Sequence, residues 1–391
     1  MSAATRTPHN LSVLLGLIGG QVFLHASMAG LRMAAPLSIL RTGGSELEVG
    51  SLLGLFSGAS VLLALPAGRL ADRRGYHYPV RLSVVLTILG ALTALASTYR
   101  GPAHYALLCL SAVLSGSGAN IGMITISRSA GKSAHDSTEL KRIFSWLGIA
   151  PSFSNFIGPL GAGILIDHLG FAAAFALLAA LPLLSLACSR LVPHEPRTTP
   201  ATAARSGTAW DLLRSSLLRR VLAVSWFMSA SWDVHSFAVP VIGNQRGMSA
   251  SAIGSVLGIF ALSVTAVRLL IPVLAHRLGE AQVLSGAMII VAGVFAIYPF
   301  ASTVWTMAAC ATALGLALGS SQPMVMTRLH QITPPHRHGE AIALRSMASN
   351  FSSAVMPMCF GALGSAVGAS GLFWAMGALV AGGAFVARSL R

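Results

Sequence analysis

Charged residues are scarce in this sequence. Only 9% of its 391 residues are Asp, Glu, Lys or Arg, whereas 54% are hydrophobic. A soluble fold of this length would need far more polar surface than these residues can supply. Apolar runs of about 20 residues, the length of a helix that crosses a bilayer, recur along the whole sequence. The composition therefore predicts an all-α integral membrane protein.

Acidic residues and cysteines are also few. The chain has 11 Asp and Glu against 26 Lys and Arg, which gives a formal net charge of +15. Because the basic residues lie between apolar runs, we interpret them as topology signals and expect no nucleic-acid partner. Cys109, Cys188, Cys310 and Cys359 each lie inside an apolar run without paired spacing. This pattern favours reduced packing residues over disulfides or metal ligands.

Motifs for catalysis are absent from the sequence. No phosphate-binding glycine loop, metal-ligand spacing or nucleophile motif occurs between the apolar runs. We therefore expect no enzymatic activity, no cofactor and no metal site. The first apolar run continues past any cleavage site of a signal peptide, so we expect it to remain as a membrane helix.

Twelve apolar segments are long enough to cross a membrane. They form two sets of six, separated by residues 190–219, which are rich in Pro, Thr, Ser and Arg and predict a linker. We expect one six-helix bundle over 1–189 and a second over 220–391. The predicted spans are 11–38, 47–67, 79–99, 103–126, 143–166, 171–189, 220–242, 250–271, 281–299, 304–327, 340–366 and 371–388.

The basic residues are distributed unevenly between the two sets of loops. One set holds only Arg41, Arg100 and Arg246, and the other set and the linker hold most of the rest. Because Lys and Arg accumulate in cytoplasmic loops, this asymmetry places the linker and both termini in the cytoplasm. We expect a multi-pass protein of the inner (cytoplasmic) cell membrane, surrounded by lipid and functional as a monomer.

The two halves of the sequence repeat each other in the same direction. A shift of 204 residues places Pro36 on Pro240, and a shift of 198 residues places Pro159 on Pro357. Parallel repeats with a site near the middle of the membrane are typical of transporters in which one half rocks against the other. The alternative is an old duplication without moving parts.

The segment GRLADRRG at 68–75 resembles the loop between the second and third helices of the major facilitator superfamily. Its degraded counterpart, PVLAHRLG at 272–279, is also usual in that family. The resemblance covers essentially the whole chain. It implies a secondary active transporter with twelve transmembrane helices in two parallel, pseudo-repeated six-helix bundles, with a proton gradient as the driving force.

In that family the loop stabilises the outward-facing state, and the resemblance carries this gating role to Gly68, Asp72, Arg73 and Gly75. Gly68 would allow two helices to approach closely, and Gly75 would permit a tight turn. Asp72 would complement the positive N-terminal end of a neighbouring helix. Where the family continues with two basic residues, this sequence has Tyr76 and His77, and Arg81 is expected to substitute. Alternatively, the arginines of this loop serve only as cytoplasmic anchors.

The segment GPLGAG at 158–163 resembles a glycine-proline pattern that the family's exporters carry on their fifth helix. The match covers Gly158, Pro159 and Gly163. Pro159 removes a backbone hydrogen bond, and the glycines form a face that packs closely. Ordinary small-residue packing accounts for the pattern equally well. Drug–proton antiporters of the family often carry an arginine on the fourth helix where this sequence has Ala112, which counts against a standard multidrug antiporter.

Charges inside apolar segments indicate a candidate site. An ionised Asp in the middle of a membrane helix costs about 2.5–3.5 kcal/mol, so we expect Asp233 to face a partner or a cavity. The 204-residue shift places Arg32 on position 236, about one helical turn from Asp233. Three interpretations remain open: a substrate site in which Asp233 holds a cation or Arg32 an anion, a proton switch at Asp233, or a permanent ion pair. His25 and His235 are further candidates for proton coupling.

Other polar and aromatic residues are expected to line a cavity: Asn120, Gln322, Asn350 and Asn155, with Trp226, Trp232 and Trp146 as possible aromatic faces. Arg268 is expected to reach the cytoplasmic surface or to brace the halves. Arg345 is expected to anchor the cytoplasmic end of its helix.

The leading hypothesis is proton-coupled efflux, by alternating access, of a small organic molecule such as an antibiotic, siderophore or metabolite. The first alternative is import or facilitated passage of a polar or anionic metabolite held by Arg32. A membrane sensor or scaffold without transport activity is the second alternative.

Overall fold

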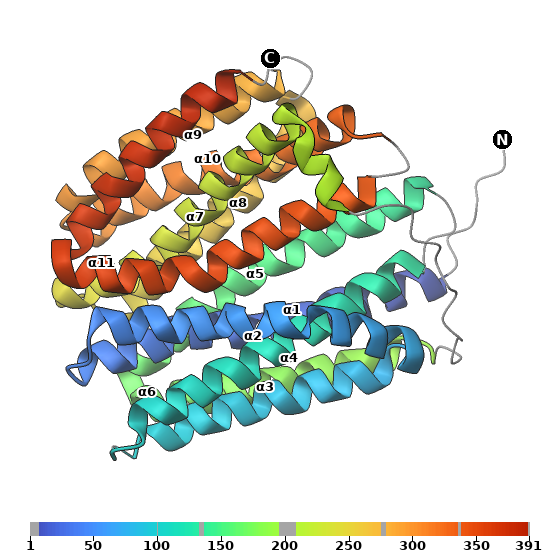
Figure 1. The fold of residues 1–391 in the computed structure, drawn as a ribbon. Helices are drawn as coiled ribbons and strands as arrows, with labels where there is room; N and C mark the ends of the chain where they lie inside the picture. Colours follow the sequence, from blue (N-terminus) through green and yellow to red (C-terminus); the bar gives the residue numbers. More distant parts are fainter. Residues whose placement is uncertain are drawn as a thin grey trace. The chain divides into compact units, whose positions relative to one another are not determined.

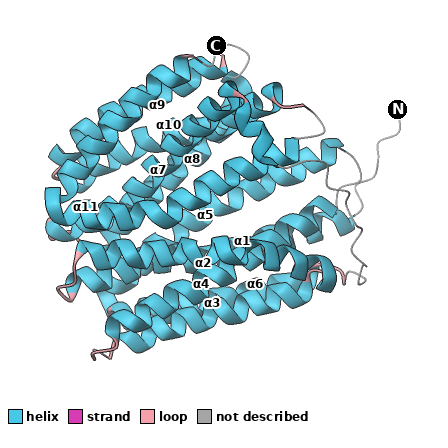
Figure 2. Ribbon diagram, viewed as in Figure 1, coloured by secondary structure: helices cyan, strands magenta, loops and turns pink. Residues whose placement is uncertain are grey.

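The computed structural model describes residues 8–99, 101–132, 137–194, 209–274, 279–334 and 338–389. These residues form helices joined by short loops, and no strand occurs among them (Figure 1, Figure 2). The predicted all-α fold is therefore confirmed. The helices are α1 (Pro8–Arg41), α2 (Glu46–Arg74), α3 (His77–Ser97), α4 (His104–Lys132), α5 (Ser137–Leu169), α6 (Phe171–Cys188), α7 (Ser216–Gln245), α8 (Ala250–Leu274), α9 (Glu280–Ile297), α10 (Val304–Ile332) and α11 (His338–Arg388).

The element α11 comprises two helices that meet at Gly368. This glycine has φ 71° and ψ 166°, a backbone conformation that interrupts a helix and that residues other than glycine rarely adopt. The described residues thus contain the twelve long helices that the sequence predicts. Three short 3₁₀ turns accompany them, at Ser189–Leu191, Ala209–Arg214 and Tyr298–Phe300.

Ten of the described helices are long and apolar enough to cross a membrane. The helix α7 and the first part of α11 fall outside this group because polar residues interrupt their apolar character. Asp233 and His235 lie in the middle of α7, and α11 carries Arg345 and the pair Ser352 and Ser353. These two helices pack against each other. The least apolar helices of the fold therefore lie side by side.

The chain divides into two compact units. Unit 1 comprises residues 1–35 and 62–202, and unit 2 comprises residues 36–61 and 203–391. Residues 36–61 thus group with the second half of the sequence, whereas the predicted division kept them in the first. Close helix packing explains this: a Cβ atom at Gly50 would lie 2.2 Å from the carbonyl oxygen of Pro357, and one at Gly54 would lie 2.8 Å from that of Ala354.

In unit 1, α3 packs between α4 and α6. The Ser83 hydroxyl donates a hydrogen bond of 2.6 Å to the Gly118 carbonyl and so joins α3 to α4. The Ser185 hydroxyl of α6 donates one of 2.8 Å to the Gly20 carbonyl of α1. Because these hydroxyls bond to backbone carbonyls, the small residues keep polar groups satisfied where helices approach closely.

In unit 2, α7 packs on α11, α8 on α10, and α9 on both α10 and α11. An aromatic cluster fills the space beside α7. The ring of Tyr298 stacks on Phe373 with centroids 4.6 Å apart, and the ring of His235 lies 4.4 Å from that of Phe260. This cluster packs against the side of α7 that carries His235. Ser229 and Asp233 of α7 instead form hydrogen bonds with serines of α11.

Candidate solute-binding site

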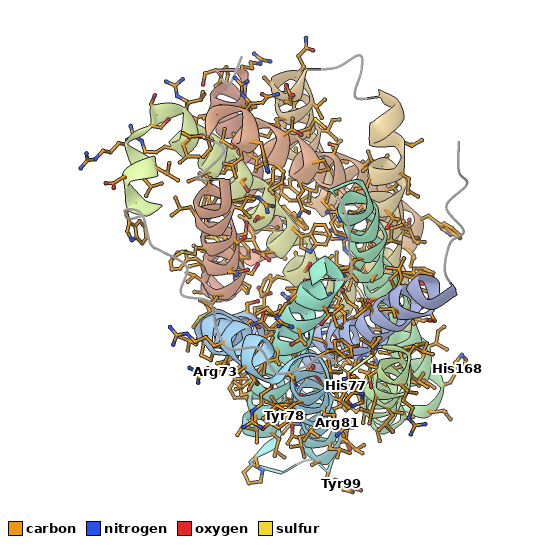
Figure 3. The ribbon with its side chains drawn as sticks, turned by 90° about the vertical axis from the view of Figure 1, so that its right-hand side faces the viewer. Arg73, His77, Tyr78, Arg81, Tyr99 and His168 are labelled. Carbon is orange, nitrogen blue, oxygen red and sulfur yellow. The ribbon has the colours of Figure 1, made fainter. Side chains whose placement is uncertain are left out.

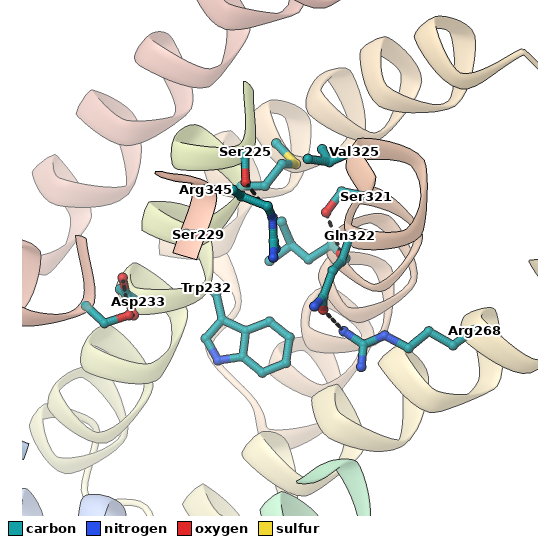
Figure 4. A pocket seen from close by; sticks show the side chains of 12 residues that line it. Ser225, Ser229, Trp232, Asp233, Arg268, Ser321, Gln322, Val325 and Arg345 are labelled. Atoms are coloured by element: carbon teal, nitrogen blue, oxygen red, sulfur yellow. Dashed lines mark hydrogen bonds between the residues drawn. The ribbon is translucent and has the colours of Figure 1, made fainter. Parts of the chain in front are cut away.

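A cavity of about 130 Å³ lies within unit 2, lined by residues of α7, α8, α10 and α11 (Figure 4). Its ionisable lining residues are Asp233, Arg268 and Arg345. The other polar lining residues are Ser225, Ser229, Ser321, Gln322 and Ser353, and the apolar ones are Met228, Trp232, Leu318 and Val325. Three ionisable side chains around so small a space distinguish it from a packing defect between apolar helices, which would stay dry and uncharged.

Asp233 is held at one edge of this cavity by serines of α11. Its side chain is only 4% exposed. The Ser352 hydroxyl donates a hydrogen bond of 3.1 Å to Oδ2, and the Ser353 hydroxyl donates one of 3.0 Å to Oδ1. Figure 4 shows the carboxylate pointing to the opposite side from Trp232. Because α7 packs on α11, two consecutive serines of α11 can solvate a buried carboxylate that water barely reaches.

The two arginines reach the cavity from different helices. Arg345, on α11, donates a hydrogen bond of 3.2 Å from Nε to the Ser225 hydroxyl of α7. Arg268, on α8, donates one of 2.6 Å from Nη2 to the side-chain oxygen of Gln322 on α10. Both guanidinium groups line one small cavity, so their like positive charges repel each other more strongly than they would in water.

Trp232 supplies the main aromatic surface of the cavity. Its ring packs edge-on against Phe260 of α8, with centroids 4.6 Å apart at 75°. Figure 4 shows the indole ring, the Gln322 amide and the Arg345 guanidinium directed into the same space from three helices. The cavity therefore joins cationic donors, hydroxyl groups and an aromatic face.

Of the cavity residues that the sequence predicts, the structure brings together Asp233, Gln322 and Trp232. Asn350 of α11 is exposed and does not line this cavity. His25, Arg32, Asn120 and Asn155 belong to unit 1, where each is half-buried. His25 and Arg32 both lie on α1, about two helical turns apart. The proposed pairing of Arg32 with Asp233 stays a prediction.

His235 lies apart from the cavity. Its ring is fully buried against Phe260 and Tyr298, and neither ring nitrogen has a hydrogen-bond partner among the described residues. The hydroxyl of Tyr298 likewise has none in that part of the chain. This packing is that of a structural histidine within the aromatic cluster. The role of His235 in proton coupling stays a prediction.

The sequence predicts that Arg268 reaches the cytoplasmic surface or braces the halves, and that Arg345 anchors the cytoplasmic end of its helix. The structure adds that both line the same cavity as Asp233. The sequence carries a signal for Arg268, because AVRLLIP places a charge inside an apolar run. A charge at that position raises the same question of a partner or cavity as Asp233 does.

The expected gating loop turns at Gly75, which has φ 69° and donates from its backbone N–H to the Ala71 carbonyl at 3.0 Å. This supports the expected tight turn. No described atom lies within 4 Å of where the Cβ of Gly68 would stand, so the expected close approach of two helices at Gly68 stays a prediction. The side chain of Asp72 and residues 275–278 of the degraded copy lie outside the described residues.

The side chains that follow this turn divide between core and surface. Tyr76 is 1% exposed, and His77 stacks on His194 with ring centroids 4.0 Å apart. Figure 3 shows Arg73 and Arg81 at the periphery of this part of unit 1, where both are exposed. Tyr76 and His77 thus make internal contacts at the positions where basic residues were expected.

The glycine-proline pattern of α5 lies at a close helix contact. A Cβ atom at Gly158 would lie 2.3 Å from the Ala26 carbonyl oxygen of α1. Pro159 and Gly163 are buried on the same helix. The packing interpretation of this pattern therefore has direct support within unit 1.

The part of the chain that the structure describes contains no group of three His, Cys, Asp or Glu side chains placed to hold a metal ion. The four cysteines are free thiols. The side chains that line the cavity offer charge and hydrogen bonding.

Solved structures with the same fold were found by comparison. A transporter of the POT family, crystallised with a thioalcohol-conjugated peptide, has 13% sequence identity and a TM-score of 0.76, and the match covers 95% of this chain and 94% of that one. The nucleoside transporter NupG has 17% identity and a TM-score of 0.72, with 98% of this chain and 99% of that one covered. At such low identity, these likenesses establish the fold alone.

No curated protein matches this sequence. The family model described as Major Facilitator Superfamily matches residues 17–279 and 221–391. The two matches extend over nearly the entire sequence and agree with the twelve described helices. The protein is therefore a membrane transporter and not an enzyme, and it belongs to the Major Facilitator Superfamily.

Proposed function

We propose that this protein is a secondary active transporter that moves a small organic molecule by alternating access and couples this movement to protons through Asp233. The observation that carries the proposal is a buried carboxylate at the edge of a polar cavity, on a membrane helix of a transporter fold. A buried ionisable group in a membrane helix is expensive to maintain, and such groups mark ion and substrate pathways.

The hydrogen bonds of Asp233 give proton binding a structural consequence. The ionised carboxylate only accepts hydrogen bonds, and it accepts them from Ser352 and Ser353. A protonated carboxyl group has an O–H of its own to donate and a weaker capacity to accept, so the hydrogen bonds from the two serines should weaken or rearrange. Protonation therefore changes the contact between α7 and α11 at the wall of the cavity. In our proposal, this change biases the equilibrium between the two access states.

The coupling role predicts a specific loss in the Asp233→Asn variant. A thermal-shift screen of metabolites and antibiotics at two pH values first identifies a transported solute. In proteoliposomes, the variant should lose accumulation driven by a pH gradient but retain exchange of labelled solute across the membrane, because asparagine has nearly the shape of aspartate but cannot exchange a proton.

Asp211→Asn is the matched control for this experiment. Asp211 is exposed in the 3₁₀ turn Ala209–Arg214 that precedes α7, and its substitution should leave gradient-driven transport unchanged. If Asp233→Asn accumulates solute as the unaltered protein does, proton coupling through Asp233 is excluded.

We propose export as the direction of transport, supported by the resemblance of the α5 pattern to that of the family's exporters. In this proposal the protein acts in the inner membrane, as a monomer, with both termini and the linker in the cytoplasm. Import of an anionic metabolite is the second candidate, and the two arginines of the cavity favour an anion over a cation. Solute accumulation in vesicles driven by an outward proton gradient, with the lumen acidic, indicates antiport and supports export. Accumulation driven by an inward proton gradient indicates symport and supports import.

A further inference from the structure

We propose that the cavity of unit 2 binds a small organic anion whose carboxylate or phosphate group lies between Arg268 and Arg345. The inference names the substrate class for the proposed transport function and rests on it. Binding itself requires no gradient and no movement of solute, so it can be measured separately from transport.

The charges of the cavity select an anion. Its ionisable lining residues are two arginines and one aspartate, so one positive charge has no counterpart among them. The aspartate already accepts hydrogen bonds from two serines. The two guanidinium groups line the same small cavity, where like charges repel each other more strongly than in water. An anion between them would add two attractions that outweigh this repulsion in a medium of low dielectric constant.

The hydrogen-bonding capacity of the arginines also favours an anionic ligand. Within the described residues, Arg268 donates one side-chain hydrogen bond, to Gln322, and Arg345 donates one, to Ser225. A guanidinium group has five N–H donors in a planar fork that fits carboxylate and phosphate oxygens. Both arginines therefore keep donors for a bound anion. The bonds to Gln322 and Ser225 hold the two guanidinium groups in position on opposite helices.

The rest of the lining limits the remainder of the molecule. Trp232, Met228 and Val325 give the cavity an apolar wall next to the arginines. Its volume of about 130 Å³ is close to that of a cavity of about 150 Å³ that holds benzene. The anionic group should therefore carry a short apolar or aromatic part that packs against Trp232. The ligand class is a small aromatic or short-chain organic acid or phosphate ester.

Four compounds with one phenyl ring test this inference by isothermal titration of the purified protein. Benzoate and phenyl phosphate present the two anionic groups, benzamide is the neutral counterpart of benzoate, and benzylamine is a cation. We expect one of the anions to bind at least about tenfold more tightly than benzamide, because charge-assisted hydrogen bonds are the stronger ones. Which anion binds more tightly distinguishes a carboxylate from a phosphate. Benzamide equal to both anions, or benzylamine tighter than either, would overturn the proposal.

Substitutions then assign the binding to the two arginines. Arg268→Gln and Arg345→Gln should each weaken the tighter anion at least about tenfold and leave benzamide unchanged. Arg220→Gln, at an exposed arginine of α7, is the matched control and should bind as the unaltered protein does. Arg268→Lys keeps the charge but not the fork, so it should be intermediate, and it remains informative if the glutamine variants fail to fold. Anion binding that survives intact in Arg268→Lys and Arg345→Lys, or in the glutamine variants, contradicts the assignment.

The outcomes separate this inference from the proposed function. Anion binding that depends on the arginines, in a protein without solute flux, leaves the site in place and removes the transport proposal. The opposite result is proton-coupled flux of a neutral or cationic solute that depends on Asp233 and is not inhibited by benzoate or phenyl phosphate. It would leave the transport proposal in place and exclude the anion site.

Discussion

The ring and the hydroxyl of Tyr76 contribute differently to the core of unit 1. It follows the turn at Gly75 and is 1% exposed, packed in a cluster with Leu17, Leu24 and Ile126. Its hydroxyl is buried without a hydrogen-bond partner among the described residues. Burial in turn raises the pKa of Tyr76, so the phenol stays neutral at physiological pH. The ring stabilises unit 1, whereas the hydroxyl does not.

Two substitutions of Tyr76 should therefore have different effects on stability. Tyr76→Ala removes the ring and leaves a cavity, which should lower the free energy of unfolding by about 3–5 kcal/mol. Tyr76→Phe keeps the ring and removes an unsatisfied hydroxyl, so stability should be unchanged or raised by about 1 kcal/mol. Thermal unfolding of the purified variants, measured in one detergent, checks both. A Tyr76→Phe variant as unstable as Tyr76→Ala would show that the hydroxyl has a partner.

At the site, the sequence predicts single residues better than their grouping. Asp233 and Gln322 stand out because a charged or amide side chain interrupts an apolar run, and both line the cavity. The sequence does not place Arg268 and Arg345 in the cavity, because a long arginine side chain near the end of a span can reach the membrane surface. Whether it does so or turns inward depends on the packing of α7, α8, α10 and α11, which hydropathy does not specify.

At the scale of whole helices, the contact between α5 and α1 depends on a glycine. A Cβ atom at Gly158 would lie 2.3 Å from the Ala26 carbonyl oxygen and 2.9 Å from the Gly30 nitrogen. Backbone atoms cannot move aside as a flexible side chain can, so the helices would have to separate. The pattern at 158–163 therefore fixes a helix contact, whatever its further role in transport.

Gly158→Ala should lower the free energy of unfolding by about 1–3 kcal/mol, because overpacking forces the two backbones apart. Gly161→Ala, one turn along the same helix, is the matched control. Its Cβ would meet only a Leu177 methyl at 3.7 Å, and alanine favours helix by up to about 1 kcal/mol over glycine. Thermal unfolding of both variants provides the comparison. Equal stability of the two would mean that α1 and α5 do not pack as closely as described.

Hydropathy predicts where the helices lie along the sequence, but not which helices pack together. Apolar runs place the spans, because each helix must be long and apolar enough for the membrane. They do not show which helices pack together. Residues 36–61 join unit 2 through Gly50 and Gly54, which contact the backbone of α11. A glycine in a membrane helix indicates a close approach but not its partner, so the division into units required the structure.

For the whole molecule, the division into units limits how the proposed alternating access can occur. Residues 36–61 group with unit 2, but the chain continues into unit 1 at both ends. A movement of unit 1 must therefore either bend α1 and α2 or carry residues 36–61 away from unit 2. Pro36 lies inside α1 and Pro66 inside α2, close to the two junctions. In residues 36–61, Glu46 accepts a hydrogen bond of 2.9 Å from the Gln245 amide of α7.

If residues 36–61 move away during transport, a covalent link at this hydrogen bond should stop the cycle. We expect Glu46→Cys and Gln245→Cys, joined by a short bifunctional thiosulfonate reagent in a background without the four native cysteines, to reduce solute flux in proteoliposomes to background. Reduction of the link should restore it. Each single-cysteine variant, treated with the same reagent, controls for modification without a link. Full flux through the linked protein would instead show that these residues stay with unit 2 and that α1 and α2 bend near their prolines, where a backbone hydrogen bond is missing.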